Sequence, residues 1–188
     1  MKGSLWVAFA CVATLGAADA HASDRSWDKA SSIVRNAVVV SALGVPAVQG
    51  DWTGSLEAGA SVGAAFGAAE GLKRLFPEMR PDGSNDKSFP SGHTASAFAA
   101  AASLQNRYGW EAGLPAQIAA AFVGVARVKA RKHHWYDVVA GAALGEAADL
   151  GGDDGEAAAL LAGAGGLDGG VEGQDVGLEG DAVDGADD

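Results

Sequence analysis

The chain has 188 residues, with 24 acidic and 13 basic side chains and a formal net charge of −11. The charge is uneven: the stretch from Asp149 to Asp188 holds 12 acids and no Lys or Arg, so residues 1–148 carry 12 acids against 13 bases. A near-neutral body gives no electrostatic support for nucleic-acid binding, and we expect no nucleic-acid partner. The length is sufficient for one domain with a buried core.

Residues 1–22 are typical of a secretory signal peptide. Lys2 supplies a positive start, Leu5 to about Gly16 form an apolar run, and the small residues Ala18-Asp19-Ala20 follow. The run is shorter than the ~20 residues of a spanning helix, so cleavage is favoured over an uncleaved anchor. The one cysteine, Cys11, lies in this segment, so we expect no thiol chemistry in the mature protein. We expect an exported protein, either periplasmic or in the inner membrane with its site facing the periplasm.

Residues 23–148 are predicted to form one all-α domain, a bundle of about five to six helices. Alanine, glycine and valine dominate, and no alternating strand pattern is sustained. The expected helices, in chain order, cover residues 26–48 with a break near 44–46, 55–76 with Asp51 as a candidate cap, Pro90 to about 106, 114–128 and 135–148. A turn-rich loop is expected at 81–86.

The helices leave membrane association open. The charge-free runs at 36–50, 58–69 and 112–126 are each under ~18 residues and rich in Gly and Ala. This favours a soluble or peripheral bundle. The same small residues, however, suit close helix packing within lipid.

Residues 149–188 differ in composition from the rest. They are rich in glycine and acidic residues and contain no aromatic residue, a composition that cannot bury enough surface to fold. We therefore expect a disordered, low-complexity acidic tail. A change of reading frame near Ala148 is an alternative explanation of the abrupt shift.

Three segments of the body concentrate its reactive polar residues: Lys73 to Pro81, Pro90 to His93, and Arg127 to Asp137. Each segment, taken alone, also fits a purely structural role. The first could be the basic end of a helix, the second could hold a core histidine beside a helix cap, and the third could be a solvated loop with a surface ion pair. The middle segment, Pro90-Ser91-Gly92-His93, also begins a helix, and the free N–H groups of a helix start attract anions.

Taken together, the three segments resemble the type 2 phosphatidic acid phosphatase / vanadium haloperoxidase superfamily. The family's pattern is Lys-x6-Arg-Pro, Pro-Ser-Gly-His and Ser-Arg-x5-His-x3-Asp. Every position has its counterpart here except the serine before Arg127, which is Ala126. The resemblance covers roughly residues 51–146.

The resemblance implies a metal-independent phosphomonoesterase that acts on lipid phosphates or soluble phosphomonoesters and uses no cofactor. His133 would be the nucleophile and form a phosphohistidine, Asp137 would hold its other nitrogen, and His93 would protonate the leaving alcohol. The phosphate would bind to residues with positive charge or hydrogen-bond donors, namely Lys73, Arg80, Ser91, Gly92 and Arg127. His134 is expected to be structural or at the rim.

Three alternatives stay open. A vanadate-dependent haloperoxidase would share the same anion-binding residues. A zinc site built from His93, His133 and Asp137 is a second alternative, but the neighbouring cations would repel a metal ion. An inactive or truncated family member is the third, because the unusual tail could replace a final packing helix.

Overall fold

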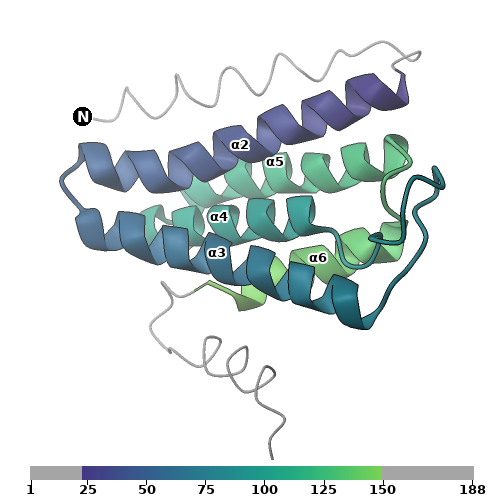
Figure 1. Cartoon of the computed structure of the whole chain (residues 1–188). Coiled ribbons are helices and arrows are strands. Elements are labelled where there is room, and N and C mark those ends of the chain that lie inside the picture. Colours follow the sequence, from purple (N-terminus) through teal and green to yellow (C-terminus); the bar gives the residue numbers. More distant parts are fainter. Residues whose placement is uncertain (1–22, 150–188) are drawn as a thin grey trace, which may run out of the picture.

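The computed structural model describes residues 23–149, which form an all-α bundle (Figure 1). Within that range the helices are α2 (Asp24–Val48), α3 (Trp52–Leu75), α4 (Gly92–Tyr108), α5 (Trp110–Lys129) and α6 (Trp135–Ala147). The all-α prediction is therefore confirmed. The expected signal peptide and, beyond Asp149, the expected tail lie outside the described residues.

Most helix ends lie within three residues of the expected ones, and two larger differences occur. The break predicted near residues 44–46 is wrong: α2 continues to Val48, because Pro46 stands in the last turn and removes only one backbone donor. The Pro46 carbonyl then accepts the N–H groups of Gln49 and Asp51 at 3.0 and 2.9 Å, which closes the helix. Helix α5 begins at Trp110, before the expected start at 114. Gly109, with φ +75°, turns the chain directly from α4 into α5.

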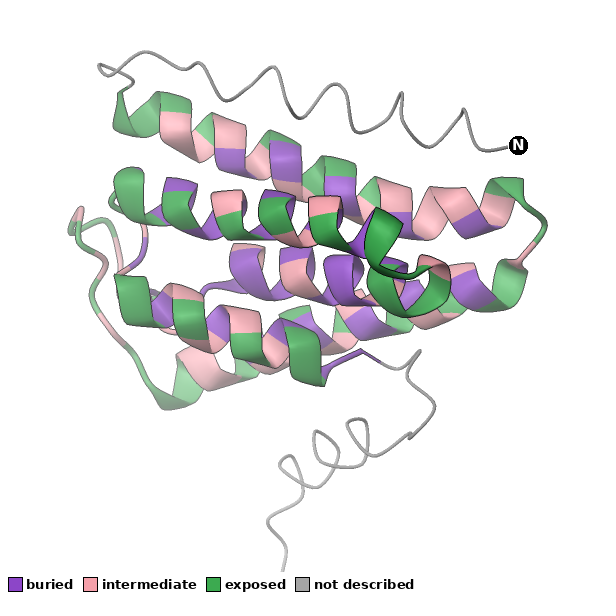
Figure 2. Ribbon diagram, turned by 180° about the vertical axis from the view of Figure 1, so that it is seen from behind, coloured by how far each residue is buried: buried purple, intermediate pink, exposed green. Residues whose placement is uncertain are grey.

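Helix α4 is the centre of the bundle, with α2 and α5 on one side of it and α3 and α6 on the other (Figure 1). Most of its residues are buried, and Figure 2 shows this concentration of burial. The helix suits this position because its core-facing residues are mainly alanines, which have the highest helix propensity and allow neighbouring helices to approach closely.

Small side chains fill the interior, and many large apolar side chains lie outside. The buried core consists mainly of alanines with a few valines and Leu104. The exposed set includes Ile33, Val40, Trp52, Leu56, Leu75, Trp110, Ile118, Trp135 and Val139. Small residues inside a bundle and large apolar residues outside it are a pattern that also occurs in helices that contact lipid.

Two glycines of α6 allow it to pack tightly against α4. A Cβ on Gly141 would lie 2.5 Å from the Ser91 carbonyl oxygen, and a Cβ on Gly145 would lie 2.5 Å from that of Ala95. Both distances are too short for any side chain, so the helix-helix spacing depends on these glycines. The contact at Gly141 places the first turn of α4 against α6.

The bundle extends to Asp149, the first residue of the expected tail. Its carboxylate accepts hydrogen bonds from Ser103 Oγ at 3.0 Å and from the side-chain amide of Asn106. Asp149 therefore fixes the end of α6 against the C-terminal half of α4.

Candidate active site

The three reactive segments meet at one end of the bundle, where α3 ends and where α4 and α6 begin (Figure 1). Backbone hydrogen bonds join them directly. The Ser91 N–H donates to the Asp137 carbonyl at 3.0 Å, and the Asp82 N–H donates to the Arg131 carbonyl at 3.0 Å. The Lys132 ammonium also pairs with the Asp82 carboxylate at 2.6 Å. The fold thus brings together residues that are up to about 60 positions apart in the sequence.

The loop between α3 and α4 folds back on itself. The Glu78 N–H donates to the Asp86 carbonyl at 2.9 Å, and the Ser88 N–H donates to the Glu78 carbonyl at 2.9 Å. This short pairing holds Arg80 on one arm and Ser88 on the other. Ser88 lies buried beneath the start of α6.

His133 is the buried imidazole of the site, with 2% of its surface exposed. Its Nδ1 lies 2.7 Å from the Ser88 carbonyl oxygen. A carbonyl oxygen can only accept, so Nδ1 carries the hydrogen and Nε2 keeps its lone pair when the ring is neutral. Burial, together with the positive charges of Arg127 and Arg80, lowers the pKa of His133 well below its ordinary value. The ring is therefore neutral at pH 7, which is the form that can attack an electrophile.

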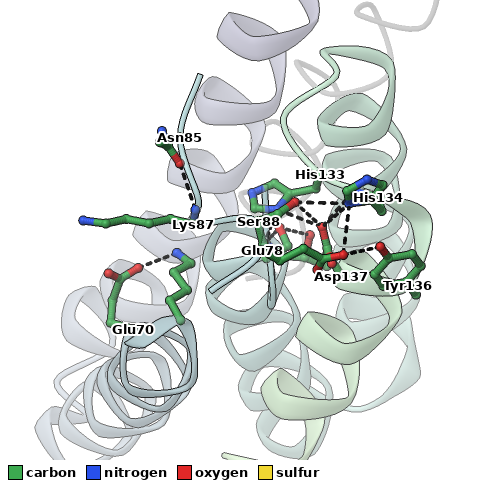
Figure 3. Close-up of polar contacts among 12 residues, drawn as sticks. Glu70, Glu78, Asn85, Lys87, Ser88, His133, His134, Tyr136 and Asp137 are labelled. Atoms are coloured by element: carbon green, nitrogen blue, oxygen red, sulfur yellow. Dashed lines mark hydrogen bonds and ion pairs between the residues drawn. The ribbon is translucent and has the colours of Figure 1, made fainter. Parts of the chain in front are cut away.

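Asp137 lies behind His133 and is fully buried. Its Oδ2 accepts hydrogen bonds from Ser88 Oγ at 2.6 Å and from the His134 N–H at 2.8 Å, as Figure 3 shows. The same oxygen is 3.6 Å from His133 Nδ1. Asp137 was expected to accept the hydrogen bond of His133, but the Ser88 carbonyl accepts it instead. The sequence gives no indication of this role of Ser88, because no side-chain pattern reveals a backbone acceptor.

His93 stands in the first turn of α4 and is half-buried. Its Nε2 lies 3.3 Å from Ser32 Oγ on α2. The Ser32 hydroxyl donates its one hydrogen to the Asp28 carbonyl at 3.1 Å, so His93 Nε2 is the donor to Ser32. Burial and the nearby charges of Arg127 and Arg35 lower the pKa of His93 to about 3. In the absence of an anion this ring is therefore neutral.

The cations expected to bind phosphate surround the two histidines. Lys73, at the end of α3, pairs with Glu70 at 2.5 Å, and its Nζ is 3.3 Å from the position that a Cβ on Gly92 would occupy. Arg127, near the end of α5, is buried and pairs with the Asp28 carboxylate. The Nε atoms of Arg80 and Arg127 are buried without a hydrogen-bond partner among the described residues. An unpaired buried donor costs about 1–3 kcal/mol, and an anion bound between these arginines would satisfy them.

Ser91 and Gly92 form the start of α4, as the sequence predicted. Ser91 is the N-cap: its Oγ accepts the Thr94 N–H at 3.4 Å and lies 2.9 Å from Thr94 Oγ1. The hydroxyl is therefore already engaged within the helix. Gly92 is buried against Lys73 and Phe66, so the absence of a side chain leaves room at the helix start.

His134 is the residue before α6 and lies beside the site rather than within the ring of cations. Its Nδ1 is 3.7 Å from Glu78 Oε1 and 3.4 Å from Asp137 Oδ2, and its ring stacks on Tyr136 with 5.0 Å between centroids (Figure 3). The ligand atoms of Glu78, His134 and Asp137 lie within 4.8 Å of one another, close enough to share a metal ion. Hydrogen bonds from Ser88, His134 and Tyr136 already engage both carboxylates, so these hydrogen bonds account for the closeness of the three side chains.

Sequence reasoning missed the contribution of α2. Asp28 holds Arg127, and Ser32 contacts His93. On the amphipathic helix these residues could have been noticed as polar positions four apart. Nothing in the sequence, however, indicated that their face turns toward the two signature segments.

Comparison with known proteins identifies the family of the chain. The profile of the PAP2 superfamily matches residues 54–151. The chain is also similar to the lipid A 1-phosphatase of Porphyromonas gingivalis, with 40% identity over 76 residues, which is 39% of this chain and 17% of that protein. The chain thus matches only a small part of that relative's length. No solved structure gives a significant match. With its profile match across more than half of its residues, this chain belongs to the PAP2 superfamily.

Proposed function

We propose that the protein is a phosphatase that hydrolyses a phosphomonoester, through a phosphohistidine formed on His133. The observation that carries the proposal is the buried, neutral imidazole of His133, whose Nδ1–H is fixed by the Ser88 carbonyl. Its Nε2 is thereby left with a lone pair, and the flanking charges of Arg80 and Arg127 suit the oxygens of a phosphate. Membership of the superfamily supports the same reaction class.

In the first step, His133 Nε2 attacks phosphorus and the bond from phosphorus to the ester oxygen breaks. The charge on the equatorial oxygens is stabilised by Lys73, Arg80 and Arg127. The leaving alkoxide takes a proton from His93. In the second step, His93 accepts a proton from water as that water attacks the phosphorus. The P–N bond then breaks, which releases inorganic phosphate and restores the neutral imidazole.

His93 can act as an acid only when its pKa rises, because burial and nearby cations lower that pKa to about 3 in the free protein. A phosphate dianion bound between the cations offsets part of their charge. We therefore expect substrate binding to raise the pKa of His93 and to favour its protonation. The protein would then generate its acid only when a substrate is present.

We further propose that the substrate is a lipid phosphate. Two observations support this class. The relative from Porphyromonas gingivalis is named for a lipid phosphate, and large apolar side chains on the outside of the bundle offer a surface for lipid. Helix α2 is long and apolar enough to cross a membrane by length and composition alone, which is weaker support. We propose that the protein works at a membrane of the cell envelope.

Hydrolysis of two substrates tests the proposal: phosphatidic acid in detergent micelles and a water-soluble aryl phosphate. Both are compared for the wild type and His133→Ala. We expect release of phosphate from the lipid to be faster, and both activities to be lost in the variant. Activity that survives in His133→Ala would contradict the mechanism, whereas a preference for the aryl phosphate would contradict only the lipid assignment.

A further inference from the structure

Helix α2 lies before residue 54, where the superfamily profile begins to match, yet it forms one wall of the candidate site. Asp28, Ser32 and Arg35 are spaced by four and then three residues. On an α-helix this spacing places all three on one face. That face is turned toward the first turn of α4 and the end of α5.

Two contacts establish how α2 faces the site. The Asp28 carboxylate pairs with the buried guanidinium of Arg127. One turn further on, Ser32 Oγ lies 3.3 Å from His93 Nε2. Each contact joins α2 to a residue that the proposed reaction uses. Arg35 stands on the next turn of the same helix face, so this turn also borders the candidate site.

Arg35 has the properties of an anion-binding residue. Its side chain is half-buried, and its Nε is buried without a hydrogen-bond partner among the described residues. Its charge helps to lower the pKa of both His93 and Arg127, as expected for a guanidinium close to each of them. Lys73 and Arg127 are each paired with a carboxylate. Within the described part of the chain, Arg35 has no such ion pair.

We propose that Arg35 is a further phosphate-binding residue, which donates hydrogen bonds to the substrate's phosphate on the side facing His93. This inference rests on the proposed function and adds to it a cation that the signature segments do not contain. A partly buried cation whose buried Nε has no acceptor is costly to maintain, and a bound phosphate would both pair it and neutralise it. Arg35 would thereby share the dianion with Arg80 and Arg127.

Binding of inorganic phosphate, measured by titration calorimetry in the absence of any substrate, tests the inference. The full chain is compared with Arg35→Gln, Arg35→Lys and a matched control, Lys29→Gln. Lys29 is an exposed cation on the same helix, so its removal changes the net charge equally. We expect Arg35→Gln to weaken phosphate binding by roughly tenfold to a hundredfold. Arg35→Lys should weaken binding less, and Lys29→Gln should leave it within about twofold.

A thermal melt of each variant separates loss of binding from loss of folding. The inference is contradicted if Arg35→Gln is folded and binds phosphate as tightly as the wild type, or if Lys29→Gln weakens binding to the same extent. If Arg35→Gln does not fold, the Arg35→Lys variant takes its place, because it keeps the charge but loses the forked geometry of the guanidinium. A folded Arg35→Lys variant that binds phosphate as tightly as the wild type would then contradict the inference. Failure of the wild type to bind phosphate at all would overturn the proposed function together with this inference, whereas intact binding in Arg35→Gln would overturn this inference alone.

Discussion

The imidazole Nδ1–H of His133 donates to the backbone carbonyl of Ser88 at 2.7 Å, while the nearest oxygen of Asp137 lies 3.6 Å away. A backbone carbonyl therefore selects the tautomer of His133. The Asp137 carboxylate instead receives the Ser88 hydroxyl and the His134 N–H. Asp137 organises the residues around the imidazole and adds a negative charge behind it.

This arrangement predicts a moderate effect of Asp137→Asn. An aspartate that alone sets the tautomer of a catalytic histidine costs about 10⁴-fold in kcat when it becomes asparagine. Here the Ser88 carbonyl still holds Nδ1–H, so we expect a loss of roughly tenfold to a hundredfold from the missing charge. Steady-state kinetics on the aryl phosphate measure it.

The matched variant Asp137→Ala should be much less stable than Asp137→Asn. It leaves the Ser88 hydroxyl and the His134 N–H without an acceptor, at about 1–3 kcal/mol each. Urea unfolding measures the difference. A kcat loss of about 10⁴-fold in a well-folded Asp137→Asn variant would show that the carboxylate, and not the Ser88 carbonyl, controls the tautomer.

A second prediction concerns the spacing of α4 and α6. Gly141→Ala would place a methyl group 2.5 Å from the Ser91 carbonyl oxygen, which forces the start of α4 away from α6. We expect a loss of about 1–3 kcal/mol in unfolding free energy, and a fall in activity because Ser91 begins the turn that carries His93.

Gly44→Ala is the matched control for this substitution. Gly44 lies inside α2, and a Cβ there would meet no atom within 4 Å. Alanine should therefore leave activity unchanged and add about 0.5–1 kcal/mol of stability. Equal effects of the two substitutions in denaturant unfolding would contradict the close-contact explanation.

A third prediction concerns the dependence of stability on pH. The pKa of His93 is about 3 in the native state, compared with an ordinary value of 6.5. Below pH ~6.5 the unfolded chain therefore binds a proton that the native state does not. The stabilising contribution of neutral His93 is present above that pH and is lost progressively as the pH falls toward about 3, by up to about 1.4 kcal/mol per pH unit.

Urea unfolding between pH 7.5 and pH 4.5 measures this loss. The wild type should lose stability over that range, and His93→Gln should lose less because it has no proton to gain. The carboxylates and His133, whose pKa is also lowered, are present in both proteins, so the difference between the two curves reports mainly on His93. Parallel curves for the two proteins would show that His93 is protonated normally in the folded state.

A fourth prediction concerns metal dependence. Cationic side chains are the groups proposed to stabilise the phosphate, so EDTA should leave hydrolysis of the aryl phosphate unchanged. Orthovanadate should inhibit, because it resembles the transferring phosphoryl group and would bind to the same cations. Strong inhibition by EDTA, reversed by adding a divalent cation, would instead support a metal at the cluster of Glu78, His134 and Asp137.

Much of this arrangement can be predicted from the sequence, for identifiable reasons. Alanine-rich helical stretches and the Asp51 cap, which accepts the Gly54 N–H at 2.9 Å, locate the helices. Fixed spacings such as that between His133 and Asp137 mark the reactive segments. These features are local, so they can be recognised without the fold.

The remaining features depend on tertiary contacts that leave no local pattern. The Ser88 carbonyl is a backbone group, and the pairing of Asp28 with Arg127 joins residues about 100 positions apart. The predicted break near Gly44 failed because a proline in the last turn of a helix costs little. The partial burial of Arg35 similarly follows from how α2 lies against α4 and α5.

The most direct test of the account is to trap the phosphoryl group on the protein. The wild type, His133→Ala and His93→Ala are mixed with a labelled phosphomonoester, quenched in alkaline detergent, which preserves phosphohistidine, and analysed by peptide mass spectrometry. We predict a label on His133 in the wild type and none in His133→Ala. In His93→Ala, in which release by water is slowed, the label on His133 should persist for longer. A label on another residue, or phosphate release by His133→Ala at the wild-type rate, would contradict the central claim.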